Sequence, residues 1–276
     1  MPRSSGMTER GDIIELDDHV VMCGDATNPD DVRELMGGQK AELLFTSPPY
    51  ADLRTYGGIA NLDEKHLAEF IPAWKKYAEY IAVNVGLIRR GYEIVEWWRP
   101  YFDSAKKAGL KRLAWNVWDK LSVGGIGSQS AMFPIRHEWI FVFGEKYKTL
   151  NKTWPKRQPE NADRDREITR RNPDGTMTRQ LRRYLPDRMK QMESVSRIMT
   201  ELRPIRSKHP ACFPPELPQE YIKAMTESND IVADCFGGSG STLIAAAESN
   251  RKSRIMEINP EYCDVIKWRY EQWKNN

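Results

Sequence analysis

Short apolar runs alternate with segments of helical spacing along most of the chain. The apolar runs have the length of buried strands, and they are residues 12–22 (two strands around Asp17 and Asp18), 41–45, 81–88, 113–118, 135–143, 230–234 and 254–258. Helical spacing begins at a cap on Asn28 or Asp30 and recurs in residues 62–80, 92–108, 214–225 and 241–249. Strands that alternate with helices in this way predict an α/β fold with a mostly parallel sheet.

Residues 146–208 depart from this pattern. They are poor in aliphatic side chains and carry 18 Lys/Arg against 8 Asp/Glu, whereas the rest of the chain carries 24 against 31. The turn sequence Asn172-Pro173-Asp174-Gly175 interrupts the segment, and residues 179–202 have the spacing of a basic helix. A basic segment on an acidic body indicates a polyanion-binding insert, with a solvated charged surface as the alternative.

Composition argues against several classes of protein. No apolar run reaches the roughly 18 residues of a spanning helix. His137 and Glu138 are adjacent, but no partner ligands lie at a useful spacing, so we interpret them as a structural pair. No C-x-x-C pair occurs among the cysteines, which are Cys23, Cys212, Cys235 and Cys263. We therefore expect a cytoplasmic protein without a metal, a disulfide framework or a membrane segment.

The sequence Thr46-Ser47-Pro48-Pro49-Tyr50 follows the apolar run 41–45. Two successive prolines remove two backbone donors and fix two φ angles, so the loop leaves its strand stiff and exposed. It presents the Ser47 hydroxyl, backbone carbonyls and the Tyr50 ring. Acceptors beside an aromatic face suit a planar group with an amino substituent, such as a flipped nucleobase.

A second loop, Asp234-Cys235-Phe236-Gly237-Gly238-Ser239-Gly240, lies between a predicted strand and a predicted helix. Glycines let the backbone approach a ligand closely, and a helix N-terminus offers N–H groups to an anion. Glu257 ends the following strand, where a carboxylate can hold both ribose hydroxyls of an adenosine. Because the pattern is not G-x-G-x-x-G, a dinucleotide is not the first choice of ligand.

Together the two loops resemble the motifs of the S-adenosylmethionine-dependent DNA methyltransferases that modify exocyclic amino groups. Residues 234–240 are similar to their D-P-F-x-G-S-G cofactor motif, and residues 47–50 to their (D/N/S)-P-P-(Y/F/W) catalytic motif. The order of catalytic motif, basic segment and cofactor motif is that of the beta class. Cys235 stands where the family usually has proline, and Ser241 where threonine is common, and both replacements are small.

The resemblance implies a mostly parallel, seven-stranded, Rossmann-like methyltransferase sheet flanked by helices, with an inserted basic target-recognition region. It divides the chain into a flexible tail (1–11), a catalytic half (12–145), the basic insert (146–208) and a cofactor-binding half (209–276).

The resemblance also assigns roles to residues. The segment Lys208–Pro214 resembles the motif that precedes the cofactor loop, and Gly24-Asp25 resembles an acid near the adenine amino group. The catalytic residues would be Ser47, Pro48, Pro49 and Tyr50. S-adenosylmethionine would be bound by Asp25, His209, Phe213, Pro214, Asp234, Phe236, Gly238, Ser239, Gly240, Ser241 and Glu257. The basic segment matches no named motif of the family, and it is from its charge that we expect DNA to be bound by Arg170, Arg171, Arg179, Arg182 and Arg183.

The resemblance implies methyl transfer to a flipped base in double-stranded DNA, in a bacterial, archaeal or phage-encoded protein. Serine at position 47 favours the N4 amino group of cytosine, whereas relatives with aspartate mostly modify N6 of adenine, which is the alternative. An RNA or protein-amide methyltransferase and a non-catalytic nucleic-acid-binding protein are further alternatives. No cysteine follows a proline, which disfavours carbon-5 methylation. A homodimer and a cognate restriction endonuclease are partners that the family leaves open.

Overall fold

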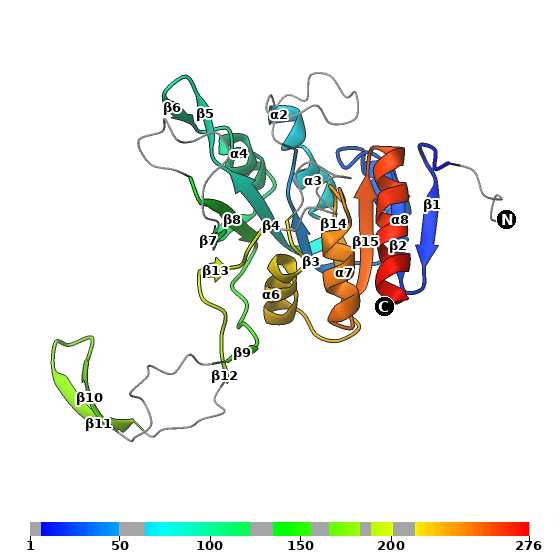
Figure 1. Cartoon of the computed structure of the whole chain (residues 1–276). Helices are drawn as coiled ribbons and strands as arrows, with labels where there is room; N and C mark the ends of the chain where they lie inside the picture. Colours follow the sequence, from blue (N-terminus) through cyan, green and yellow to red (C-terminus); the bar gives the residue numbers. More distant parts are fainter. Residues whose placement is uncertain are drawn as a thin grey trace.

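The computed structural model of the chain describes residues 7–49, 64–121, 135–155, 166–182, 189–200 and 213–275. Within these residues, nine strands form one sheet in the order β1-β2-β15-β14-β3-β4-β8-β7-β13 (Figure 1). Strands β2, β15, β14, β3 and β4 are parallel, and β8 runs antiparallel between β4 and β7. The strands are β1 (Ile13–Leu16), β2 (His19–Cys23), β3 (Ala41–Thr46), β4 (Ala78–Gly86), β7 (Lys111–Asp119), β8 (His137–Gly144), β13 (Val195–Arg197), β14 (Ile231–Asp234) and β15 (Lys252–Glu257).

The predicted α/β class is confirmed, but the sheet has nine strands rather than seven within the described residues. At one edge β1 folds back on β2 as a hairpin, with Asp17 at φ 53° in the turn. At the other edge β13 adds parallel to β7. Both additions occupy backbone groups that a sheet edge would leave unpaired. Because β13 lies within residues 146–208, the basic segment contributes a strand to the main sheet.

Helices cover both faces of the sheet (Figure 1). On one face lie α1 (Pro29–Met36), α3 (Phe70–Trp74) and α4 (Arg99–Lys107), whose buried side chains include Leu35, Trp74 and Tyr101, with α2 (Glu64–Leu67) beside α4. On the other lie α6 (Glu216–Met225), α7 (Ser241–Glu248) and α8 (Pro260–Lys274). None of the described helices is long and apolar enough to cross a membrane.

The helix predicted over residues 92–108 begins later, at Arg99. Before it, β5 (Ile88–Arg90) and β6 (Glu93–Val95) form a short hairpin, which Gly91 turns with φ 63°. Pro100 in the first helical turn then starts α4. Similarly, the predicted helix 62–80 stops at Trp74, and β4 begins at Ala78. Of the two caps considered for α1, Asn28 is the one used, since its side chain accepts from the Asp30 N–H.

The basic helix predicted over residues 179–202 is wrong in the part that the structure describes. Strands β10 (Arg166–Arg171) and β11 (Met177–Arg182) form an antiparallel ribbon that stands away from the sheet (Figure 1). Short strands β9 (Trp154–Pro155) and β12 (Met189–Lys190) pair nearer the body. The predicted turn forms, with Gly175 at φ 86°, and Asn172 Nδ2 donates across it to the Thr178 hydroxyl. The tight turn brings the two short strands together, and their pairing outweighs the helical propensity of this segment.

Candidate active site

The predicted site residues meet at one edge of the sheet. Parallel strands β2, β15, β14 and β3 all end there, and the register pairs Glu257 with Cys23 and Asp234 with Ile255. Asp25, Glu257, Asp234 and Ser47 therefore follow one another along the carboxyl ends of adjacent strands. This is the edge where open α/β sheets bind their ligands.

A buried hydrogen bond joins the two loops directly. Thr46 Oγ1 donates to Asp234 Oδ1 at 2.7 Å, and Thr242 Oγ1 donates to Oδ2 at 2.6 Å. The Phe236 N–H also donates to Oδ1, at 3.0 Å. Burial raises the pKa of the Asp234 carboxyl to about 6. Sequence reasoning placed Thr46 in the catalytic stretch without giving it a role, and it did not single out Thr242.

The glycine loop packs tightly against β15 and α8. A Cβ at position 237 would lie 2.5 Å from Ile255 Cγ2 and 3.0 Å from Ile266 Cδ1, so only glycine fits there. Gly240 is the N-cap of α7 with φ 81°, and it makes no side-chain cap hydrogen bond. Gly237, Ser239 and Gly240 are buried and Gly238 is half-buried, so backbone rather than a capping side chain lines the start of α7.

Glu257 is 7% exposed and closes the glycine loop. Its Oε2 accepts from the Gly238 N–H at 2.8 Å, and its Oε1 from the Asn259 N–H at 2.9 Å. Burial raises the pKa of Glu257 to about 7. A carboxylate has about four acceptor positions, so each oxygen can accept from one further donor.

Asp25 lies next to Glu257 because the Gly24 N–H donates to the Glu257 main-chain oxygen at 3.0 Å. Its Oδ1 accepts from the Thr27 N–H and hydroxyl, and its Oδ2 is 3.6 Å from an Arg10 nitrogen.

Beneath the glycine loop, α8 supplies a buried arginine. Arg269 Nη1 lies 3.0 Å from both the Ser239 and the Ser241 hydroxyl oxygens. Ser241 Oγ also donates to the Phe213 main-chain oxygen at 2.6 Å, which ties α7 to the start of α6. Sequence reasoning did not identify Arg269, whose helix carried no motif.

The aromatic residues predicted for the cofactor site lie around the same edge. Phe213 and Pro214 are buried, and the Phe213 ring packs edge-on to Phe45 at 5.7 Å between centroids. Phe236 packs edge-on to Phe70 at 5.4 Å. His209 lies outside the described residues.

The catalytic loop is described as far as Pro49. Pro48 is buried, Ser47 and Pro49 are half-buried, and Tyr50 lies outside the described residues. Ser47 Oγ donates to the main-chain oxygen of Asn84 on β4 at 3.2 Å. With its hydrogen directed into the sheet, the hydroxyl oxygen can still accept a hydrogen bond from a bound molecule.

The side chains of the arginines predicted to bind DNA are described in part. Arg170, Arg171 and Arg179 are exposed on the β10–β11 ribbon, Arg182 ends β11, and Arg183 lies outside the described residues. Glu138 of the His137–Glu138 pair is buried and paired with Lys120, and no group of three or more possible metal ligands occurs among the described residues.

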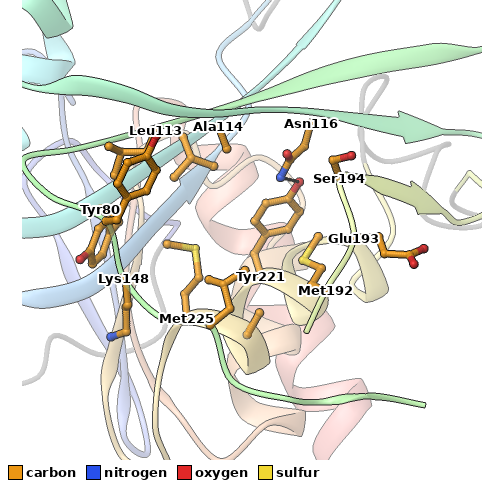
Figure 2. A pocket seen from close by; sticks show the side chains of 14 residues that line it. Tyr80, Leu113, Ala114, Asn116, Lys148, Met192, Glu193, Ser194, Tyr221 and Met225 are labelled. Atoms are coloured by element: carbon orange, nitrogen blue, oxygen red, sulfur yellow. Dashed lines mark hydrogen bonds between the residues drawn. The ribbon is translucent and has the colours of Figure 1, made fainter. Parts of the chain in front are cut away.

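A cavity of about 280 Å³ lies away from this edge, between β4, β7, β8 and α6 (Figure 2). Its walls are mainly apolar and include Tyr80, Leu113 and Met225, and Asn116 donates to the Tyr221 hydroxyl at 3.0 Å. None of the predicted site residues that the structure describes is among the residues that line it. Residues 192–194 close one side, and the Ser194 main-chain oxygen accepts from Val117 N–H, which fastens the basic segment to β7.

A parallel sheet with a glycine loop, a buried acid on the next strand and a proline-stiffened polar loop defines a class of nucleoside-cofactor-dependent transferases. A family model described as DNA methylase matches residues 41–268, and the chain belongs to this family. The family assignment predicted from the two motifs is thereby confirmed.

Among curated relatives, the orphan methyltransferase M.BamHII of Bacillus amyloliquefaciens is 29% identical over 257 residues, covering 88% of this chain and 93% of the relative. Type II methyltransferase M.PvuII of Proteus hauseri is 42% identical over 62 residues, 22% of this chain and 18% of the relative.

Solved structures share the fold. The PvuII DNA methyltransferase, titled cytosine-N4-specific, aligns with a TM-score of 0.60 at 17% identity, covering 92% of this chain and 89% of that one. A Thermus thermophilus protein complexed with S-adenosyl-L-methionine aligns with a TM-score of 0.58 at 19% identity, covering 92% and 93%.

Proposed function

We propose that this DNA methylase transfers a methyl group to the N4 amino group of a cytosine that is flipped out of duplex DNA. The observation that carries the proposal is the Thr46–Asp234 hydrogen bond of 2.7 Å. It fixes the strand that leads into Ser47 against the glycine loop, so an amino group bound at Ser47 lies beside a cofactor bound at that loop.

S-adenosylmethionine is the cofactor, as predicted, and when bound it supplies an electrophilic methyl group on a sulfonium sulfur. The described residues fit it. The free acceptor positions of Glu257 suit the two ribose hydroxyls, and Asp25 beside it suits the adenine amino group. The backbone of Gly238 to Ser241 at the start of α7 suits a carboxylate. We propose that His209, Phe213, Pro214 and Phe236 complete the pocket around the adenosine.

Asp234 has a different role in this proposal. Its Oδ1 already accepts from two protein donors and its Oδ2 from a third, one donor more than Glu257 has, and its side chain is only 1% exposed. We therefore propose that Asp234 positions the two loops and does not itself bind the cofactor.

The catalytic loop activates the target by orientation. An aromatic amino group is a poor nucleophile because its lone pair is delocalised into the ring. In this proposal Ser47 Oγ accepts one N–H of the target amino group and the Pro48 carbonyl accepts the other. These two hydrogen bonds would hold the nitrogen pyramidal, with its lone pair free to form the N–C bond. As the N–C bond forms, the sulfonium S–C bond would break with its electron pair staying on the sulfur, and the methylated nitrogen would then lose one proton to solvent. Orientation of this kind can lower a barrier by roughly 7–11 kcal/mol, and stacking on Tyr50 would contribute roughly 1–3 kcal/mol.

Two observations favour cytosine over adenine as the target base. Residue 47 is a serine, and the chain matches M.PvuII, whose solved structure is described as cytosine-N4-specific. The Ser47 hydroxyl does not by itself discriminate between cytosine and adenine. Its hydrogen is donated to the Asn84 main-chain oxygen, so towards the target base it acts as an acceptor, as a carboxylate would.

Nucleoside analysis of methylated DNA tests the target base. DNA incubated with the protein and S-adenosylmethionine, digested and analysed by mass spectrometry, should contain N4-methylcytosine. N6-methyladenine in its place would contradict the cytosine assignment and leave the role of the loop intact. A control with heat-inactivated protein sets the background.

We further propose that the β10–β11 ribbon contacts the DNA. A two-stranded ribbon fits the major groove, and alternate residues point to opposite faces. By register, Arg170 and Gln180 share one face, and Arg171 and Arg179 share the other. Arginine and glutamine are the side chains suited to guanine and adenine edges, so the first face is the one we assign to the bases.

Removal of charge from the ribbon should weaken DNA binding and its salt dependence. We expect Arg171→Gln with Arg179→Gln to lower affinity and to reduce the slope of log K against log salt by about 0.9 for each phosphate that is no longer neutralised. Fluorescence anisotropy at several salt concentrations measures both. Arg33→Gln, which removes an exposed arginine paired with Asp30 on α1, is the control. An unchanged slope in the ribbon variant would mean that these arginines are only solvated.

Adenine-N6 methylation is the alternative reaction of the same site. A homodimer, a cognate restriction endonuclease, a cytoplasmic location and the domain boundaries at 145/146 and 208/209 stay predictions, as do the RNA, protein-amide and non-catalytic alternatives.

A further inference from the structure

A line of polar contacts runs from the catalytic loop into the sheet. Ser47 Oγ donates to the main-chain oxygen of Asn84, and Asn84 Nδ2 donates to Glu138 Oε2 at 2.6 Å. Lys120 Nζ donates to the other carboxylate oxygen, Oε1. The contacts therefore connect the loop after β3 with β4, β8 and the end of β7.

The strand register places these groups on one face of the sheet. Glu138 lies opposite Gly86 on β4 and opposite Trp118 on β7. Cross-strand partners point to the same face, as do residues two positions apart. Asn84, two residues before Gly86, therefore points to the same face as Glu138, and Lys120 reaches it from two residues beyond Trp118.

This arrangement contributes little to folding. Asn84 is 1% exposed and Glu138 is 7% exposed, so both polar groups are withdrawn from water. Replacement of a buried ion pair by apolar residues is often neutral or stabilising. Asn84 Oδ1 adds a cost, because it is buried without a hydrogen-bond partner in the part of the chain that the structure describes.

The carboxylate fixes the orientation of the amide. Ionised Glu138 can only accept, so Asn84 must turn Nδ2 towards it, and the same nitrogen then lies 3.5 Å from Ser47 Oγ. On the Ser47 hydroxyl, the hydrogen is engaged by the Asn84 carbonyl and one lone pair faces the Asn84 amide. One lone pair is left, with a fixed direction, for the target amino group.

We propose that Asn84 and Glu138 are positioning residues for methyl transfer, with Lys120 holding the Glu138 carboxylate in place. The proposal rests on the proposed function. Neither residue touches the target base; they act through Ser47, and Glu138 acts through Asn84. Their loss therefore affects the rate of transfer and spares cofactor binding, which takes place further along the edge at Glu257.

Kinetics of DNA methylation test the proposal. Glu138→Ala should lower kcat by about tenfold or more, on the order of the loss that follows a misplaced reacting group, with S-adenosylmethionine affinity by calorimetry within about twofold of wild type. Asn84→Ala should have at least as large an effect. The double variant Asn84→Ala/Glu138→Ala should have the same kcat as Asn84→Ala alone, because Glu138 acts through Asn84. Glu138→Gln keeps an acceptor for Asn84 and should restore most of kcat.

Glu42→Ala is the matched control, since it breaks another partly buried ion pair of the sheet, with Lys148, away from this line of contacts. It should leave kcat unchanged. An unchanged kcat in Glu138→Ala overturns the proposal, and so do multiplicative effects in the double variant or a parallel loss of cofactor affinity. A wild type that transfers no methyl group to DNA overturns the proposed function and this inference with it. An active wild type with an unaffected Glu138→Ala variant overturns this inference alone.

Discussion

Ser47→Ala should lower kcat for DNA methylation by about 10²–10³-fold, the loss typical of removing one preorganised polar group from an active site. The alanine side chain accepts nothing from the target amino group, so the nitrogen lone pair returns to conjugation with the ring. Affinity for S-adenosylmethionine should stay within about twofold, because Ser47 lies beyond the glycine loop along the edge. Single-turnover rates and calorimetry measure the two effects separately.

Ser47→Asp is the control for this variant, since aspartate keeps an acceptor at the position and occurs in relatives with the same motif. It should retain more activity than alanine. A fully active alanine variant would mean that residues 47–50 are not the catalytic loop.

Glu257→Ala should weaken S-adenosylmethionine binding by at least about a hundredfold. Hydrogen bonds to a charged group contribute roughly 1.5–3 kcal/mol each, and the proposed carboxylate accepts two from the ribose. The variant also leaves the Gly238 N–H without its present acceptor, which loosens the glycine loop. Calorimetry gives the affinity, and thermal unfolding shows whether the domain remains folded. Unchanged affinity would remove Glu257 from the cofactor site.

The pKa of about 7 gives the Glu257 prediction a pH dependence. Because the pKa of Glu257 is raised in the folded state, its protonated form stabilises the cofactor-free fold. This contribution to stability is fully present below the unfolded pKa of about 4.5 and is lost as pH rises through about 7. Ribose donors favour the carboxylate, so cofactor affinity should rise between about pH 6 and pH 8, with proton release on binding. Glu257→Gln cannot titrate, and its affinity should lose this rise. An equal rise in the Gln variant would assign the titration to another group.

Local sequence signals were enough to predict the parallel sheet and the two loops. Apolar runs such as 41–45 end in polar or glycine-rich sequences, and strands of this kind share a carboxyl edge whatever their order along the chain. The family resemblance carried by the two motifs therefore predicted that Ser47 and Glu257 belong to one site, although 210 positions separate them.

Pairing between strands that are distant in the sequence could not be predicted from local sequence signals. Nothing local in Val195–Arg197 indicates a partner on β7, so the ninth strand was not foreseen. Residues 179–182 include good helix formers, but the turn at Asn172 to Gly175 pairs them with β10 in a ribbon. Asn84 was not singled out from the sequence and Glu138 only as the neighbour of His137, because their contact depends on the order of β4 and β8 in the sheet.

Methyl transfer from labelled S-adenosylmethionine to duplex DNA, RNA and a protein mixture, measured side by side with the purified protein, tests the central claim most directly. We expect label in DNA alone, recovered on an exocyclic amino nitrogen after digestion. Label on carbon 5 of cytosine, label confined to RNA or protein, or no transfer to any DNA that contains all short sequence combinations would contradict it.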